Sequence, residues 1–118
     1  VVPTINRTYA FIELDDSKVF NNIIFDSNVD GNSAIYTFIF KPYSEPEFTF
    51  TAKYGVSFTR LTDIENTNRI VISINGVGVF DGTVLNTPII MNPDDQVTIK
   101  IYKSNTVTSK FKLIGITI

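Results

Sequence analysis

The chain contains no cysteine, no histidine and no tryptophan. Without cysteine it can form no disulfide bond, no thiolate metal site and no cysteine nucleophile. Without histidine it lacks the usual proton shuttle at neutral pH and the commonest metal ligand, so Ser-His-Asp and Cys-His catalytic arrangements are excluded within the chain. The sequence therefore predicts a protein that is not an enzyme. It predicts no cofactor either, with calcium, treated below, as the one exception left open.

A strong charge of one sign and long apolar runs are also missing. The formal net charge is −2, and the scattered lysines and arginines do not form the footprint of a nucleic-acid-binding protein. No apolar run approaches the roughly 18 residues of a membrane-spanning helix, and Arg7 and Glu13 interrupt any signal-peptide pattern. The length fits a single domain, 1–118. Because the chain begins with Val1, we expect it to be the C-terminal domain of a longer or processed protein.

β-Branched and aromatic residues are abundant, with 10 phenylalanines and 5 tyrosines. Such side chains suit a pleated, half-buried surface and lose rotamer freedom in a helix. Turn signals recur about every 8 to 12 residues, which is typical of sandwiches and barrels, and no segment of helical length shows a 3.6-residue apolar period. The sequence predicts an all-β fold, a two-sheet antiparallel β-sandwich of the jelly-roll kind with eight to ten strands.

The alternation of apolar and polar residues places the individual strands. The strongest local pattern is the hairpin of Arg69–Ile74, Asn75-Gly76 and Val77–Phe80, because Asn-Gly tolerates positive φ at both turn positions. Polar residues predict loops at 26–33 and 62–68 and further turns at Asp81-Gly82 and 92–95. The other expected strands are Arg7–Leu14, Val19–Phe25, Ala34–Lys41, Glu47–Lys53, Val56–Leu61, Gln96–Tyr102 and Phe111–Ile118, with Thr83–Met91 as a short strand or irregular edge.

The segment that follows the second expected strand resembles the start of a calcium-binding loop. Asp26, Asn28 and Asp30 have the alternate spacing of oxygen ligands and are followed by Gly31. Thr37 stands where an EF-hand supplies its bidentate glutamate, which excludes an EF-hand. The alternative is a connecting loop whose Asn, Asp and Gly residues make the turn. Asp26, Asn28 and Asp30 are thus the candidate calcium ligands, in a set that is incomplete without distant ligands.

Three tyrosines are candidates for stacking against a sugar ring, a role that tryptophan fills most often. Tyr43 and Tyr54 lie near predicted turns, and Tyr102 lies on the outward face of its strand. The plainer alternative is that each tyrosine covers the core with its apolar body while its hydroxyl meets water.

The C-terminus is strongly apolar, whereas most domains end in a polar tail. Leu113 lies on one face of the last expected strand, and Ile114, Ile116 and Ile118 lie on the other. The run Ile35–Phe40 is also largely apolar on both faces. Either these strands are central and covered within the domain, or one face packs against another subunit. The second alternative makes Ile114, Ile116 and Ile118 candidate oligomer-interface residues.

The run Pro88–Ile101, followed by Phe111–Ile118, resembles the last strands of a family of jelly-roll heads. These are the complement-type and tumour-necrosis-factor-like heads, with similar heads on phage or viral fibres and bacterial surface filaments. In them an apolar strand leads to a turn with an acidic residue and then to an alternating strand, and a closing strand ends near a threefold axis. The resemblance covers about the last third of the chain. It implies a homotrimer at the tip of a fibrous or capsid-attached protein.

Two functional hypotheses follow. The first is a non-enzymatic structural or recognition module, a virion, phage-fibre or surface-filament head or decoration domain that acts in assembly or host attachment. It would be homotrimeric and located on a virion or at a cell surface, with a receptor or glycan as a further partner. The alternative is a monomeric carbohydrate-binding module, assisted by calcium or not, that is appended to a larger enzyme. Neither hypothesis involves nucleic acid or a membrane span.

Overall fold

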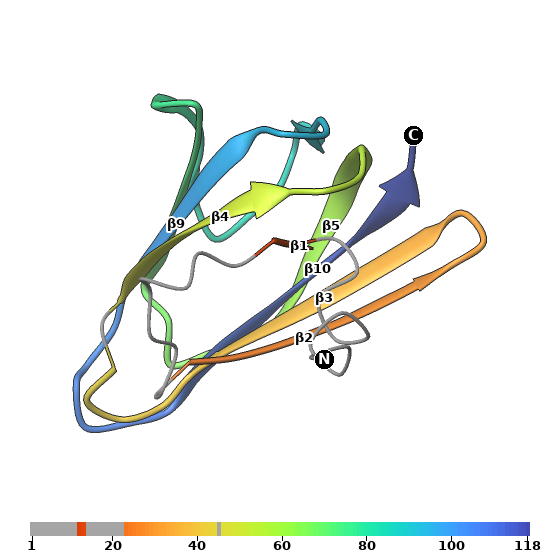
Figure 1. Ribbon diagram of the computed structural model, residues 1–118. Helices are drawn as coiled ribbons and strands as arrows, with labels where there is room; N and C mark the ends of the chain where they lie inside the picture. Colours follow the sequence, from red (N-terminus) through yellow and green to blue (C-terminus); the bar gives the residue numbers. More distant parts are fainter. Residues whose placement is uncertain (1–11, 14–22, 45) are drawn as a thin grey trace, which may run out of the picture.

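The computed structural model describes residues 12–13, 23–44 and 46–118. Within these residues, ten strands form two five-stranded antiparallel sheets (Figure 1). Sheet A has the order β1-β4-β9-β6-β7 and sheet B the order β2-β3-β10-β5-β8, which confirms the predicted sandwich. The strands are β1 (Ile12–Glu13), β2 (Ile23–Asp30), β3 (Ser33–Phe40), β4 (Glu47–Ala52), β5 (Val56–Glu65), β6 (Arg69–Ile74), β7 (Val77–Gly82), β8 (Ile89–Met91), β9 (Gln96–Tyr102) and β10 (Ser109–Thr117).

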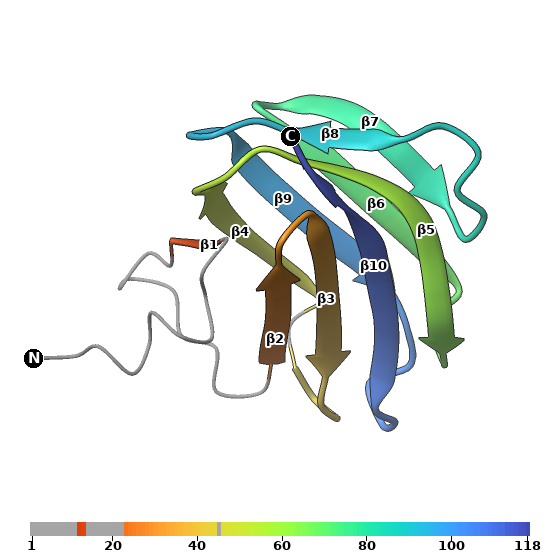
Figure 2. The same ribbon diagram turned by 90° about the vertical axis from the view of Figure 1, so that its right-hand side faces the viewer.

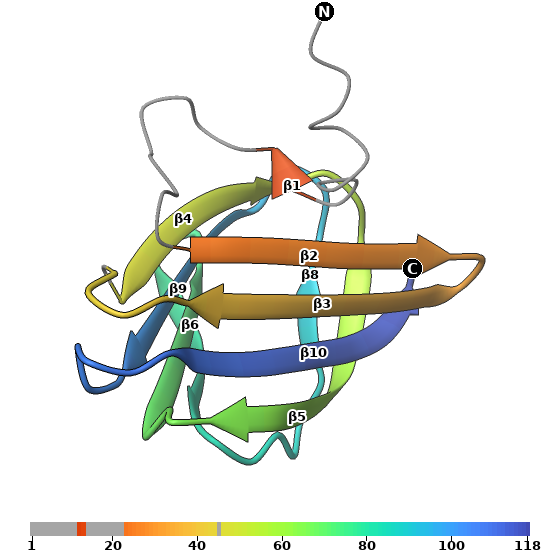
Figure 3. The same ribbon diagram turned by 90° about the horizontal axis from the view of Figure 1, so that it is seen from below.

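The order of the strands is that of a jelly roll. When the edge strands β1 and β2 are set aside, sheet B reads β3-β10-β5-β8 and sheet A reads β4-β9-β6-β7. The chain passes repeatedly from one sheet to the other, and its last strands, β9 and β10, return to pair beside β4 and β3. Two Greek keys wound together in this way make a double-sheet jelly roll. Figure 2 shows the two sheets facing each other, and Figure 3 shows β10 between β3 and β5.

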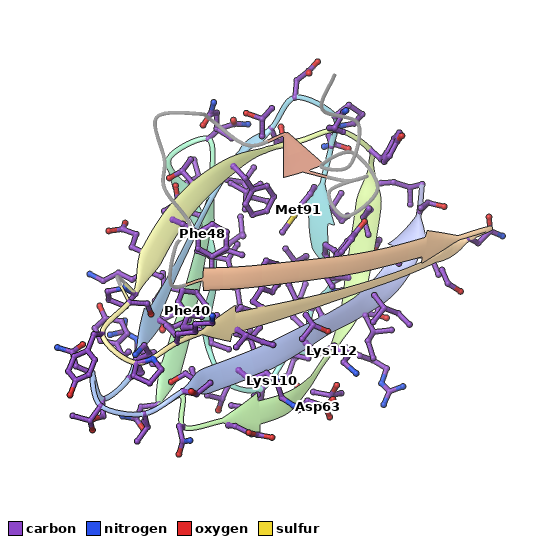
Figure 4. All side chains as sticks on the ribbon, turned by 60° about the horizontal axis from the view of Figure 1, so that its bottom comes forward. Phe40, Phe48, Asp63, Met91, Lys110 and Lys112 are labelled. Carbon is purple, nitrogen blue, oxygen red and sulfur yellow. The ribbon has the colours of Figure 1, made fainter. Side chains whose placement is uncertain are left out.

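Aromatic side chains fill the space between the sheets. Every second residue of β3 and β4 is buried, as the predicted alternation requires. The ring centroids of Phe38 and Phe111 in sheet B lie 4.9 Å apart, and Phe48 of sheet A lies 5.8 Å from Phe38 and 5.7 Å from Phe40. Figure 4 labels Phe40 and Phe48 between the layers. Burial, together with the nearby Tyr54, raises the pKa of the Tyr36 phenol above its usual value.

The Asn-Gly hairpin forms as predicted. Asn75 has a φ of 53° and Gly76 a φ of 83°, and β6 pairs with β7 across the turn. The Asn75 side chain donates to Asp95 Oδ1 at 3.0 Å and accepts from the backbone N–H of Gln96 at 3.0 Å. These two hydrogen bonds connect the hairpin turn to the end of the predicted turn at 92–95 and the start of β9.

Strand β10 approaches β5 very closely at Gly115. A Cβ at this position would lie 2.0 Å from the carbonyl oxygen of Ser57 and 2.7 Å from the Cα of Phe58. The register between β10 and β5 shifts between Ile114 and Gly115, and such bulges bend a strand and increase its twist. Glycine is required because any side chain would collide with the neighbouring backbone.

Two polar segments that were predicted to be loops are parts of strands. β2 runs to Asp30, and Asp26–Asp30 pairs with β3, so the turn is confined to Gly31 and Asn32. β5 continues to Glu65 because it pairs with Lys110 and Lys112 of the central strand β10. In both cases a long partner strand supplies backbone hydrogen bonds, and these outweigh local polarity.

Other boundaries also differ from the prediction. Asp81 and Gly82 extend β7 instead of forming a turn, and the expected strand Thr83–Met91 is reduced to Ile89–Met91. Of the first expected strand, Ile12–Glu13 is described as β1, and the rest lies outside the described residues, as do residues 19–22 of the second.

Candidate functional site

Buried hydrophobic side chains occupy the interior of the sandwich. Among the described residues, nineteen form one buried cluster between the sheets, and no group of three His, Cys, Asp or Glu side chains is placed to hold a metal ion. In the part of the chain that the structure describes, no helix is long and apolar enough to cross a membrane. The surfaces with functional potential are therefore the outer faces of the two sheets and the loops at their ends.

The outer face of sheet B carries isoleucines that strand pairing brings together. Ile114 of β10 pairs with Ile35 of β3. Ile116 pairs with Ser57 of β5, which in turn pairs with Ile90 of β8. Ile116 is 53% and Ile90 51% exposed, while Ile35 and Ile114 are half-buried. We call Ile35, Ile90, Ile114 and Ile116 the isoleucine patch.

Part of the isoleucine patch was predictable from the sequence. Ile114 and Ile116 face outward as expected, and Leu113 faces the core with no exposure. Ile118 follows the end of β10, is 66% exposed, and donates its backbone N–H to the Gly55 carbonyl at 3.0 Å. Ile90 was missed because only the register of β8 on β5 shows that it shares a row with Ile116.

The other end of the same face is charged. Lys112 Nζ lies 3.1 Å from Asp63, and Lys110 Nζ lies 3.4 Å from Glu65; Figure 4 labels Lys110, Lys112 and Asp63 together on the outside of sheet B. Exposed ion pairs of this kind contribute between zero and about 1 kcal/mol of stability. Along its outer face, strand β10 therefore changes from lysines in ion pairs at its start to isoleucines at its end.

The outer face of sheet A is polar. Thr49 and Thr98, which pair across β4 and β9, share a hydrogen bond of 3.1 Å between their hydroxyls. Arg69 donates two hydrogen bonds to Asp81, each 2.6 Å long. This charge-assisted pair lowers the pKa of Asp81 and raises that of Arg69. Polar and charged pairs of this kind are expected on the water-facing side of an antiparallel sheet. At the edge of sheet A, Val77 and Val79 of β7 are exposed as well.

The three candidate tyrosines do not form one site. Tyr43, in the β3–β4 connection, is 73% exposed, and Tyr54, in the β4–β5 connection, is 49% exposed. These connections lie at opposite ends of the sandwich (Figure 1). Tyr102 lies at the Tyr43 end, but the Arg69 guanidinium carbon and Lys100 Nζ lie 4.9 Å and 5.2 Å from its ring centroid.

The candidate calcium segment lies in β2. Asp26 pairs with Thr37, Asn28 with Ile35 and Asp30 with Ser33. The ligand loop on which the hypothesis was based is therefore replaced by an extended strand. Calcium binding by Asp26, Asn28 and Asp30 stays a prediction, without the loop geometry that suggested it.

Comparison with known proteins places the fold but not the family. No protein-family model matches the chain, and no curated protein matches its sequence. Among solved structures, the cupin domain of Cnp3 from Schizosaccharomyces pombe matches with a TM-score of 0.52 and 13% identity, over 90% of this chain and 74% of that one. At this identity the likeness shows the fold alone, and it agrees with the jelly-roll strand order.

Two further structures match more weakly. A protein of unknown function from Vibrio parahaemolyticus has a TM-score of 0.49 at 9% identity, over 87% of this chain and 96% of that one. The plu4264 protein from Photorhabdus luminescens has a TM-score of 0.45 at 17% identity, over 87% and 83%. The strand order and the likeness to the Cnp3 cupin domain confirm the predicted jelly-roll architecture. The closer resemblance to complement-type and tumour-necrosis-factor-like heads stays a prediction.

Proposed function

We propose that the chain is a non-enzymatic structural or recognition module that assembles with copies of itself through the outer face of sheet B. The assembly is a homotrimer, and the module serves as a head or decoration domain of a virion, a phage fibre or a surface filament. The observation that carries the proposal is the isoleucine patch, on a face where an antiparallel sheet ordinarily presents polar residues to water.

The energetics of the patch favour a partner. Covering an isoleucine side chain contributes about 1.5–3 kcal/mol relative to full exposure, and Ile90 and Ile116 are each half exposed. The four long strands of sheet B, β2, β3, β10 and β5, have at least eight residues each. With strands about 4.8 Å apart and a rise of about 3.3 Å per residue, the outer face has a flat area on the order of 500 Å². This is more than half of the roughly 800 Å² per partner of a standard interface.

A second copy of the chain fits this face better than an unrelated ligand. The patch lies on the outside of the sheet, over the buried core. Its isoleucines are spread over three strands, β3, β10 and β8, which suits an extended partner surface. The patch lies where β10 ends, so copies that meet there bring their C-terminal ends together, as in the trimeric heads that the sequence resembles. A heterologous contact repeated around a threefold axis closes into a ring.

The test is the molar mass of the chain in solution. We expect light scattering at micromolar concentration to give a trimer, and Ile116→Lys and Ile90→Lys to give folded monomers because each would desolvate a charge at the interface. Val84→Lys is the matched control, since Val84 is 69% exposed and lies outside the patch. A monomeric wild type contradicts self-association, and a dimer that depends on Ile116 contradicts the trimer.

A further inference from the structure

Tyr43 has an unusual backbone conformation for its residue type. The N–H of Ser44 donates to the carbonyl of Lys41 at 3.1 Å, so Lys41–Ser44 closes a turn with Pro42 and Tyr43 at its centre. Tyr43 has a φ of 64°. This hydrogen bond, the proline and the positive φ follow the pattern of a type II turn, whose third position normally takes glycine or asparagine. A bulky residue there is strained, although glycine would fit.

The strain is not offset by burial of the ring. Tyr43 is 73% exposed, the largest exposed fraction among the large hydrophobic residues that the structure describes. A tyrosine that covered the core would gain free energy from burying its apolar body, and Tyr43 gains little of this. Backbone strain that the fold does not need is a feature of binding and active sites.

A second loop holds the turn in place. The backbone N–H of Tyr43 donates to the carbonyl of Asn105 at 2.7 Å, which joins the turn to the 103–108 loop between β9 and β10. That loop is itself tied down, because Lys103 Nζ donates to the carbonyls of Ser104 and Val107 at 3.1 and 3.4 Å. Figure 1 and Figure 3 both show the two connections side by side at the end of the sandwich remote from the C-terminus.

The loop that holds the turn carries neutral hydrogen-bonding side chains. Ser104, Asn105 and Thr106 are all exposed, and the hydroxyls of Ser104 and Thr106 lie 3.1 Å apart in a mutual hydrogen bond. Of the two lysines beside the turn, Lys103 is engaged by backbone carbonyls, and Lys41 is exposed. A rigid aromatic ring beside hydroxyl and amide groups suits a ligand with one apolar face and many hydroxyls.

We infer that this end of the sandwich binds a saccharide. The Tyr43 ring stacks on a sugar ring, and Ser104, Asn105 and Thr106 hydrogen-bond to sugar hydroxyls. The site is independent of self-association, because β10 begins at the Tyr43 end and the isoleucine patch lies where it ends. Of the three candidate tyrosines, Tyr43 alone belongs to this site. Tyr54 lies at the other end of the sandwich, and the Tyr102 ring is engaged by two cations.

The test begins with a glycan array of neutral and acidic oligosaccharides, followed by titration calorimetry with the best-binding oligosaccharide. We expect Tyr43→Asn to reduce affinity at least tenfold and Tyr43→Phe, which keeps the ring, to reduce it less than threefold. Asparagine tolerates a positive φ, so Tyr43→Asn should melt at or above the wild-type temperature. That result separates loss of the ring from loss of the fold.

The controls distinguish this site from the assembly surface. Tyr54→Asn removes an exposed tyrosine from the opposite end and should leave the affinity unchanged, and so should Ile116→Lys when the affinity is expressed per chain. The inference is overturned if no saccharide on the array binds, or if Tyr43→Asn binds as well as the wild type. A monomeric wild type that still binds through Tyr43 would contradict the proposed assembly and leave the saccharide site standing.

Discussion

In the part of the chain that the structure describes, the two sheets have five strands each and share one core, but their outer faces differ. At the centre of sheet A the outward pair is Thr49 and Thr98, joined by a hydroxyl hydrogen bond. At the centre of sheet B the corresponding outward pair is Ile35 and Ile114. The inner faces are equally apolar, because both must fill the same core. The need to form a core explains the apolar inner faces of both sheets, whereas the outer isoleucines of sheet B need a second explanation.

The largest effect is expected where β10 is pressed against β5 in sheet B. Gly115→Ala should destabilise the fold by about 3 kcal/mol or more, because the new Cβ would collide with the Ser57 carbonyl and the backbone of Phe58. Gly78→Ala in sheet A is the matched control, since a Cβ there meets nothing within 4 Å. Urea unfolding measures both changes. Equal stability of the two variants would contradict the close contact between β10 and β5 at Gly115.

An intermediate effect is expected when the outer face of sheet B is made to resemble that of sheet A. The double variant Ile35→Thr/Ile114→Thr copies the Thr49–Thr98 pair. Cross-strand pairs contribute roughly 0.2–1 kcal/mol, so the stability of the single chain should fall by about 1 kcal/mol. The binding of a hydrophobic dye should fall markedly, and the molar mass in solution should fall to that of a single chain. A loss of several kcal/mol in urea unfolding, with the molar mass unchanged, would mean that these isoleucines serve the fold of one chain.

The smallest effect is expected on the outer face of sheet A, at the Arg69–Asp81 pair. The hydrogen bonds from Arg69 lower the pKa of the Asp81 carboxyl in the folded protein. The carboxylate therefore stabilises the fold above the usual aspartate pKa, and this contribution is lost as the pH falls through the lowered pKa. Asp81→Asn should be slightly less stable than the wild type at pH 7, and the difference should vanish in strong acid.

Thermal unfolding at several pH values, in low and high salt, measures this difference. Both side chains are about half exposed, so salt should weaken the effect. A difference between Asp81→Asn and the wild type that grows on acidification would have the wrong sign for a carboxyl with a lowered pKa.

Local chemistry was sufficient wherever one or two residues decide the backbone. The turn at Asn75 and Gly76 was predictable because few residues other than these accept positive φ in succession. The strands β6 and β9 have the bounds that their alternation predicted. Alternation failed at Asp26–Asp30 and at 62–65, where polar residues sit in strands because β3 and β10 are long enough to pair with them.

The candidate surfaces were harder to predict than the strands, because they depend on register. Ile114 and Ile116 could be assigned to one face from β-strand alternation, but Ile90 joins them through two pairings that no local pattern encodes. Tyr43 could be named as an exposed aromatic residue near prolines. Its left-handed backbone and its hydrogen bond to Asn105, which is far away in the sequence, required the fold.

The amino-acid sequence alone was enough to predict the all-β fold class. Period-two alternation, abundant phenylalanine and isoleucine, and turn residues at regular intervals permit two packed sheets and little else, because every strand has one face to bury. The tertiary structure decided which strands are neighbours, and so which outward residues form a surface. Side chains on the outside of a sheet contribute little to its folding, so their grouping follows from strand order and register, which are long-range properties of the chain.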